Sequence, residues 1–493
     1  MGNSRGKIKR KKCYKSIIKY YFKGGGKELK IKNNSLKIIL SNKMAIKKSR
    51  SIDGVDLSSF AISHIVGHNP IIHADIAVRK EYLEFISKYM DILKPDKDIL
   101  EKALIRAYEK IILDAEEIRE SQNIQFYKYY ILLDVYHIIS YKIRNIAIDR
   151  IYKLIEQYYG DFILKDKDKE IIDHVIDCLY RLKGINKKRC SKLSLTQNEI
   201  EYINLIRKNI AFKSKRPFEI MVTATMSAGK STFINALTGK YISLSQNMAC
   251  TSKIHTIINK TFEDNYSYEF DYDLIMTAGT EELINDNENN KTDIITVGTY
   301  FNGDLSKERI IVNDSPGINF SGDKEHKETT ERLIKAQNYD LIIYLMNATQ
   351  LSTNDEDEYL EFIKNNKGGI PIIFVINKID GLNEEEENID SIINKQIEFL
   401  QKKGFTDPIV CPVSSKAGYL SKKFFSEKLT RTEEREFYNY IDKFERMRLS
   451  SYYNKLLGRI RVRSGKQEEE KLSRLSGLSY LEKIIKYIVK GAN

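Results

Sequence analysis

The stretch ATMSAGKST, Ala224–Thr232, limits the fold of this chain more than any other feature. It follows the apolar run FEIMVTAT and leads into STFINALTG, whose apolar residues have helical spacing. A strand, a loop of small residues and a helix in this order are typical of a phosphate-binding loop, in which backbone N–H groups at a helix N-terminus meet anionic oxygens. The stretch therefore predicts an α/β unit that binds a phosphorylated ligand.

The loop keeps the glycine that phosphate binding needs most. Gly229 stands where a side chain would block the phosphates, and its neighbour Lys230 is expected to reach the β- and γ-phosphates. Ser231 is expected to ligate Mg²⁺, and Thr232 completes the nucleotide-binding residues of the loop. Ala224 replaces the usual first glycine, but it stands at the strand exit, where a small residue with ordinary dihedral angles suffices.

Two further motifs follow in the order of a GTP-binding protein. VNDSPG places Asp314 at a strand end, where it can hold Mg²⁺ through water, and provides Gly317, whose backbone N–H can sense the γ-phosphate. INKID ends another apolar run, and its Asp380 carboxylate can accept both N–H donors of guanine, a pair that adenine lacks. Asn377 is expected to brace this loop, and the stem of Lys378 to cover the base.

The fourth motif, PVSSKAG, follows the next apolar run. The backbone around Ser415 and Lys416 is expected to meet the guanine carbonyl. Each motif also occurs as an ordinary turn, helix cap or loop. Four motifs in this order, each after an apolar strand, predict GTP as the substrate, Mg²⁺ as its cofactor and ATP as the disfavoured competitor.

The periodicity of apolar residues divides the chain. Recurrence at three-to-four spacing predicts helices before Arg216, and Thr196 with Glu199 has the spacing of a capping box. After Pro217, short runs that are apolar throughout alternate with helical segments, as in a doubly wound, mostly parallel sheet. We predict a basic segment, a helical domain, an α/β P-loop GTPase domain and a short helical segment at residues 1–60, 61–215, 216–430 and 431–493.

The formal net charge of +13 is concentrated at one end of the chain. Residues 1–50 hold 17 Lys or Arg and a single acidic residue, Glu28, so the rest of the chain is slightly acidic. This basic segment can be a solvated tail, an amphipathic helix on an anionic membrane surface or a nucleic-acid arm. The third reading is the least supported, because no RNA-binding module accompanies it.

Cysteine and histidine usage indicates neither disulfides nor a transition-metal site. The five cysteines are far apart with no paired spacing, and His64, His68 and His73 have no carboxylate at ligand spacing. No apolar run is long enough to span a membrane. We therefore expect a cytoplasmic protein, with peripheral membrane attachment as an extension.

Residues 216–420 resemble the GTPase domain of the dynamin superfamily, most closely that of bacterial dynamin-like proteins. The segments that carry the resemblance are TATMSAGKSTFINALTG, ACTSKIHTI, VNDSPGINFSGDKEHKETTERL and YDLIIYLMNATQLSTNDEDEYL. The resemblance implies a GTP hydrolase whose GTPase domains self-associate across their nucleotide faces.

The resemblance also implies roles for single positions. Ser227 matches the serine that helps organise a site for a charge-compensating monovalent cation. Thr251 matches the switch threonine that binds Mg²⁺ and orients water. With Lys230, these two residues make up the expected catalytic set.

Three positions depart from the dynamin pattern. Met226 stands where dynamin has a glutamine that positions the attacking water, and a thioether cannot do so. Gln246 and Met248 replace glycines whose carbonyls help to hold the cation. These departures leave nucleotide binding intact and predict slow hydrolysis by the isolated domain.

The leading hypothesis is a dynamin-like GTPase that couples its nucleotide state to dimerisation and to movement of the helical domain. Two alternatives remain open. One is a regulatory GTPase that binds RNA or the ribosome through its basic N-terminus. The other is a GTP-gated protein scaffold with weak hydrolysis, which Met226 keeps open.

Overall fold

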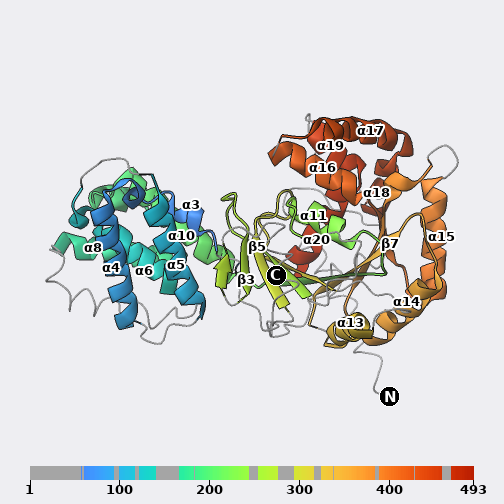
Figure 1. Cartoon of the computed structure of the whole chain (residues 1–493), viewed down its shortest axis with the longest axis horizontal. Coiled ribbons are helices and arrows are strands. Elements are labelled where there is room, and N and C mark those ends of the chain that lie inside the picture. Colours follow the sequence, from blue (N-terminus) through green and yellow to red (C-terminus); the bar gives the residue numbers. More distant parts are fainter. Residues whose placement is uncertain are drawn as a thin grey trace, which may run out of the picture.

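The protein consists of a helical part and an α/β part, each with a hydrophobic core (Figure 1). The computed structural model describes residues 57, 60–93, 99–116, 122–139, 166–182, 184–243, 254–271, 273–275, 294–315, 324–336, 338–383, 388–426, 428–457 and 468–492. The basic segment 1–50 and positions 246, 248, 251 and 317 lie outside these residues.

The helical part is built from amphipathic segments that bury one face each, as their spacing predicts. Its core is rich in Ile, Leu and Tyr and lies mainly between α4, α5, α6 and α10. The helices are α3 (Ile62–Val66), α4 (Ile76–Leu93), α5 (Ile99–Asp114), α6 (Lys128–Ile139), α8 (Asp166–Tyr180), α9 (Lys187–Lys192) and α10 (Gln197–Ser214), with short 3₁₀ turns at Pro70–His73 and Ile124–Tyr127.

Helix α10 begins with the predicted capping box. The Thr196 hydroxyl accepts a hydrogen bond from the Glu199 amide at 3.3 Å, and the Glu199 carboxylate accepts one from the Thr196 amide at 2.7 Å. Both bonds satisfy N–H groups that the first turn of a helix leaves without partners. The helix ends at Ser214, immediately before the first strand.

The α/β part is organised around a mixed sheet in the order β4-β3-β5-β2-β6-β1-β7-β8-β9. Strand β1 pairs in parallel with β6 and β7, and the parallel run continues through β8 to β9. Strand β2 pairs antiparallel with β6. The strands are β1 (Phe218–Ala224), β2 (Ile254–Asn259), β3 (Tyr268–Asp271), β4 (Asp273–Ile275), β5 (Ile294–Thr299), β6 (Ile310–Asp314), β7 (Leu341–Asn347), β8 (Ile372–Asn377) and β9 (Ile409–Pro412).

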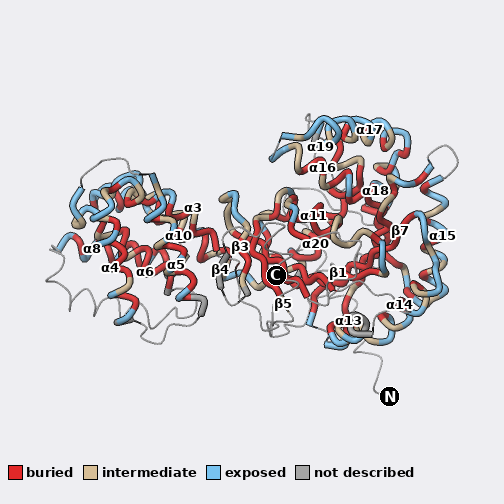
Figure 2. The backbone as a smooth tube through the Cα atoms, in the orientation of Figure 1, coloured by how far each residue is buried: buried red, intermediate tan, exposed pale blue. Residues whose placement is uncertain are grey.

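Helices cover both faces of this sheet, with α13 and α14 on one side and α11 and α20 on the other (Figure 1). Strands β1, β7 and β8 are buried along their whole length, in agreement with their largely apolar sequences. Figure 2 shows this burial for β1 and β7. The helices are α11 (Lys230–Thr238), α13 (Lys324–Ala336), α14 (Asn354–Asn366), α15 (Ile389–Lys402), α16 (Ser415–Ser426), α17 (Arg431–Met447), α18 (Leu449–Leu457), α19 (Glu468–Leu475) and α20 (Leu478–Ala492), with a 3₁₀ turn at Ile379–Gly381.

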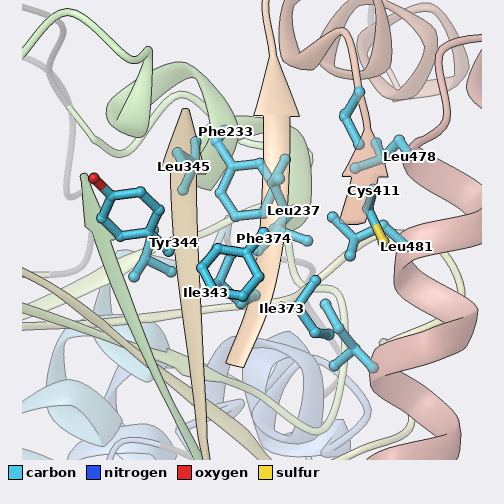
Figure 3. Close-up of a cluster of buried hydrophobic side chains, with 14 of the residues drawn as sticks. Phe233, Leu237, Ile343, Tyr344, Leu345, Ile373, Phe374, Cys411, Leu478 and Leu481 are labelled. Carbon is cyan, nitrogen blue, oxygen red and sulfur yellow. The ribbon is translucent and has the colours of Figure 1, made fainter. Parts of the chain in front are cut away.

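The C-terminal helices share the hydrophobic core of the sheet. Figure 3 shows Leu478 and Leu481 of α20 beside Cys411 of β9. A buried ion pair adds a polar link: the Lys422 ammonium lies 2.5 Å from the Glu482 carboxylate and donates to the Leu237 carbonyl at 2.7 Å. Helices α16 and α20 are thereby joined to the C-terminal end of α11.

The helical part packs against the β2–β3 end of the sheet. Its core includes Ile258 of β2 and Tyr268 of β3. Among the hydrogen bonds that connect the parts, one runs from the Thr261 hydroxyl to the Asn209 side chain at 2.6 Å, and another joins the Ser63 and Tyr268 hydroxyls at 3.0 Å. Strand β2 therefore takes part in the contact between the sheet and the helical part. Within the described ranges, no helix combines the length and apolar character needed to cross a bilayer.

Candidate nucleotide-binding site

The four predicted motifs lie at the carboxyl ends of β1, β6, β8 and β9. These strands are neighbours or near neighbours in a parallel array, so their carboxyl ends meet at one edge of the sheet. Strand β1 lies between β6 and β7, where the strand order reverses direction. Ligands of open α/β sheets bind in the crevice at such a point.

The phosphate loop connects β1 to α11 through two left-handed residues. Ser227 has a φ of 63° and Gly229 a φ of 81°. A Cβ atom at Gly229 would lie 2.6 Å from the side-chain nitrogen of Asn377, so glycine is required for space as well as for conformation. Ala224 is fully buried as the last residue of β1, in the strand conformation expected for it. Met226, three residues before Gly229, is 50% exposed.

Helix α11 begins at Lys230, and Ser231 and Thr232 occupy its first turn with partial exposure. The Lys230 ammonium forms an ion pair with the Asp314 carboxylate, although the two residues are far apart in the sequence. The other oxygen of Asp314 accepts a hydrogen bond from the Ser243 hydroxyl at 3.1 Å. The structure therefore places the expected phosphate-binding cation next to the expected metal-binding carboxylate.

The donor set around Asp314 suits Mg²⁺, which prefers oxygen ligands and is usually held by one or two protein groups together with phosphates and water. Ser231 and Asp314 provide a hydroxyl and a carboxylate at this edge. No group of three or more His, Cys, Asp or Glu residues in the described part of the chain could hold a metal by itself. A Mg²⁺ ion here would therefore share its ligands with a bound nucleotide.

Asn377, at the end of β8, connects three segments of the site. Its side-chain nitrogen donates to the Ala228 carbonyl at 2.8 Å, and its side-chain oxygen accepts hydrogen bonds from the amide of Ser415 at 3.1 Å and from its hydroxyl at 2.7 Å. The phosphate loop, the INKID motif and the SSKAG motif are thus fixed to one another. The sequence predicted that Asn377 braces a loop, but not that it joins all three.

The residues expected at the base lie next to this junction. The Asp380 carboxylate accepts a hydrogen bond from the Ser414 hydroxyl at 2.6 Å. Lys378 has a φ of 62°, and its stem reaches toward Gly229. Ser415 and Lys416 begin α16. Within the described ranges, the second carboxylate oxygen of Asp380 accepts no hydrogen bond, and the Lys378 stem lies near the loop glycine, as the expected base site requires.

Two contributors could not be found from local sequence. Ser243 reaches Asp314 from beyond α11, and Lys443 of α17 donates to backbone carbonyls next to Asp380. Neither residue belongs to a short motif, so only the tertiary structure identifies them.

Comparisons with known proteins identify the family that the sequence around this site resembles. A sequence model of the dynamin family matches residues 220–379. A bacterial dynamin-like protein from Nostoc punctiforme is 26% identical over 266 residues, which cover 48% of this chain and 36% of that protein. The chain thus aligns with about a third of the length of this relative.

Among solved structures, Era from Aquifex aeolicus bound to GDP and AlF4⁻ matches with 20% identity over 43% of this chain and 56% of that chain, at a TM-score of 0.26. The FeoB G-domain from Methanococcus jannaschii matches with 19% identity over 43% of this chain and 97% of that chain, at a TM-score of 0.24. Scores of this size say nothing about function. The two sequence comparisons confirm the resemblance to dynamins, and the α/β part of this chain contains a GTPase domain of the dynamin superfamily.

Proposed function

We propose that the protein binds GTP with Mg²⁺ and hydrolyses the β–γ phosphoanhydride. The observation that carries this proposal is the junction at Asn377, which holds the phosphate loop against the loops expected to contact the base. A site of this shape takes a phosphate chain at one end and a guanine at the other.

The proposed roles follow the geometry for the residues that the structure describes, and the sequence motifs for Thr251 and Gly317. The phosphates are bound by Gly229, Lys230, Ser231 and Thr232. The ligands of Mg²⁺ are Ser231, Asp314 and Thr251. Gly317 senses the γ-phosphate. The base is held by Asn377, Lys378, Asp380, Ser415 and Lys416.

Hydrolysis in this family of reactions depends on positioning and charge stabilisation rather than on a strong base. Lys230, Ser227 and Thr251 are proposed to supply these effects, with a monovalent cation near Ser227. The exposed Met226 offers no strong hydrogen-bonding group to an attacking water. We therefore propose that turnover is slow in the monomer and rises when two GTPase domains pair.

Strand β2 supports a proposal that the nucleotide state moves the helical domain. It pairs with β6 so that His255 lies opposite Asp314, and Thr261, shortly after its end, contacts Asn209 of α10. A displacement of β2 at the nucleotide would therefore act on the helical part. The division into domains at residues 1–60, 61–215, 216–430 and 431–493 is also proposed, and it rests on the change in apolar periodicity along the sequence.

The test is GTP turnover per molecule over a wide range of protein concentration. Turnover that rises with concentration supports paired GTPase domains, and turnover that is flat and slow supports the GTP-gated scaffold. Lys230→Ala should abolish turnover, whereas Lys240→Ala, which removes a partly exposed ion pair with Glu263 at the end of α11, should not. ATP in place of GTP should not be hydrolysed. Hydrolysis of both nucleotides at equal rates would reject the assignment to guanine.

Attachment to an anionic membrane surface through residues 1–50, from the cytoplasmic side, is a further proposal that rests on their basic composition. It predicts liposome binding that weakens with salt and disappears when these residues are deleted. Equal binding by the truncated protein would reject it.

A further inference from the structure

One face of α17 is directed at the segments expected to bind the base. Glu436, Tyr440 and Lys443 follow one another at spacings of four and three residues, which places them on the same side of a helix. The Glu436 carboxylate pairs with Lys416 at 2.9 Å, and the Lys416 ammonium lies 6.0 Å from the centre of the Tyr440 ring. Helix α17 thus contacts the SSKAG motif directly.

Lys443 makes the second contact, with the INKID loop. Its ammonium donates hydrogen bonds to the carbonyls of Asp380 and Leu382, both at 2.7 Å. The loop folds into a 3₁₀ turn over Ile379–Gly381, and Lys443 binds carbonyls in and just after that turn. Hydrogen bonds from an ammonium are stronger than those between neutral groups, so this contact restrains the backbone of Asp380.

The Asp380 carboxylate is restrained separately, by the Ser414 hydroxyl at 2.6 Å. Ser414 is itself tied to the C-terminal helices, because its amide donates to the Ser476 carbonyl at 2.9 Å. Backbone and side chain of Asp380 are therefore both fixed through helices that follow the GTPase motifs in sequence.

We propose that Lys443 is a positioning residue for guanine recognition. By holding the backbone of Asp380, it aims the carboxylate at the N1–H and 2-amino groups of the base, so that nucleotides lacking the 2-amino group bind more weakly. The proposal rests on the proposed function, because it assigns a specificity role within the same nucleotide site.

The test compares three ligands on the full chain: GTP, ITP, which lacks the 2-amino group, and inorganic tripolyphosphate, which lacks the base. In Lys443→Met, the ratio of GTP to ITP affinity should fall about tenfold, because losing a charge-assisted hydrogen bond changes an affinity by about that factor. Affinity for tripolyphosphate should stay within twofold. Lys443→Arg keeps the cationic donors and should retain the wild-type ratio.

Lys471→Met is the matched control, since it removes a partly exposed ion pair between α19 and Glu445 of α17 without touching the base loops. An unchanged GTP to ITP ratio in Lys443→Met would overturn the proposal, and so would an equal loss of affinity for all three ligands. If Lys443→Met does not fold, Lys443→Arg decides. A wild-type ratio of GTP to ITP affinity in Lys443→Arg supports the proposal, and equal affinities for GTP and ITP overturn it. Failure of the wild-type protein to prefer GTP over ATP would instead reject the proposed function.

Discussion

The side-chain amide of Asn377 donates a hydrogen bond to the Ala228 carbonyl at 2.8 Å and so links the end of β8 to the phosphate loop. Asn377→Ala removes this bond and the two that Ser415 donates. We expect GTP affinity to fall roughly thirtyfold, which corresponds to about 2 kcal/mol. Isothermal titration of GTP measures this loss. Asn354→Ala, at the exposed start of α14, should leave affinity unchanged.

Gly229 is restricted by both conformation and space. Its φ of 81° disfavours any side chain, and a Cβ atom would lie 2.6 Å from Asn377. Gly229→Ala should therefore abolish measurable GTP binding and lower the free energy of unfolding by roughly 1–3 kcal/mol. Urea unfolding and nucleotide titration test both effects. Gly369, which has open space around its Cβ position, is the control, and similar losses in Gly369→Ala would contradict this explanation.

Lys260 and Asp264 form an ion pair with side chains that are 0% and 1% exposed, at 2.5 Å. Lys260→Met leaves the Asp264 carboxylate buried without its counter-charge, and we expect a loss of about 3 kcal/mol in the free energy of unfolding. Chemical denaturation measures this. The partly exposed pair Lys335–Glu331 offers the comparison: Lys335→Met should cost less than about 1 kcal/mol. Equal losses of unfolding free energy in Lys260→Met and Lys335→Met would show that burial of the ion pair does not set its effect on stability.

Asp134 gives the helical part a pH-dependent stability. Burial raises the pKa of its carboxyl to about 7, in spite of hydrogen bonds donated by Tyr82, Tyr108, Tyr202 and Asn69. Because the folded pKa lies above the unfolded value of 3.8, the folded state binds more protons between these values, and stability falls as the pH rises from about 4 to about 7.

Asp134→Asn should remove this loss of stability, which in the wild-type protein reaches about 4 kcal/mol above pH 7. The free energy of unfolding of the variant, relative to wild type, should therefore increase between pH 4 and pH 7. Urea unfolding at several pH values measures the difference. Glu84→Gln, on the exposed face of α4, should follow the wild-type profile. A constant difference between Asp134→Asn and wild type would contradict the assignment.

The sequence predicts the central strands well because strands buried on both faces must be mostly apolar, as β7 and β8 are up to their final Asn347 and Asn377. It does not predict β3 and β4, which are short and contain polar residues such as Glu269 and Asp273. Their strand conformation depends on pairing with β5 and with each other, which no local pattern encodes.

The motif residues of the site are predictable for a related reason. Each one follows a parallel strand, so Lys230, Asp314 and Asp380 must come to one edge of the sheet. Ser243 and Lys443 reach the same edge from segments without a motif, and their contacts arise only when distant helices pack. Thr251 and Gly317 lie outside the described residues, so their assignments remain predictions.

The position of α20 also determines when the GTPase domain can finish folding during synthesis. Leu478 and Leu481 fill the same core as Phe233 and Leu237, and Glu482 neutralises a buried lysine there. The core on this face of the sheet therefore stays incomplete until these residues have left the ribosome, long after β1 and α11 have emerged. Such late, long-range closure slows folding and exposes apolar strands to aggregation in the meantime.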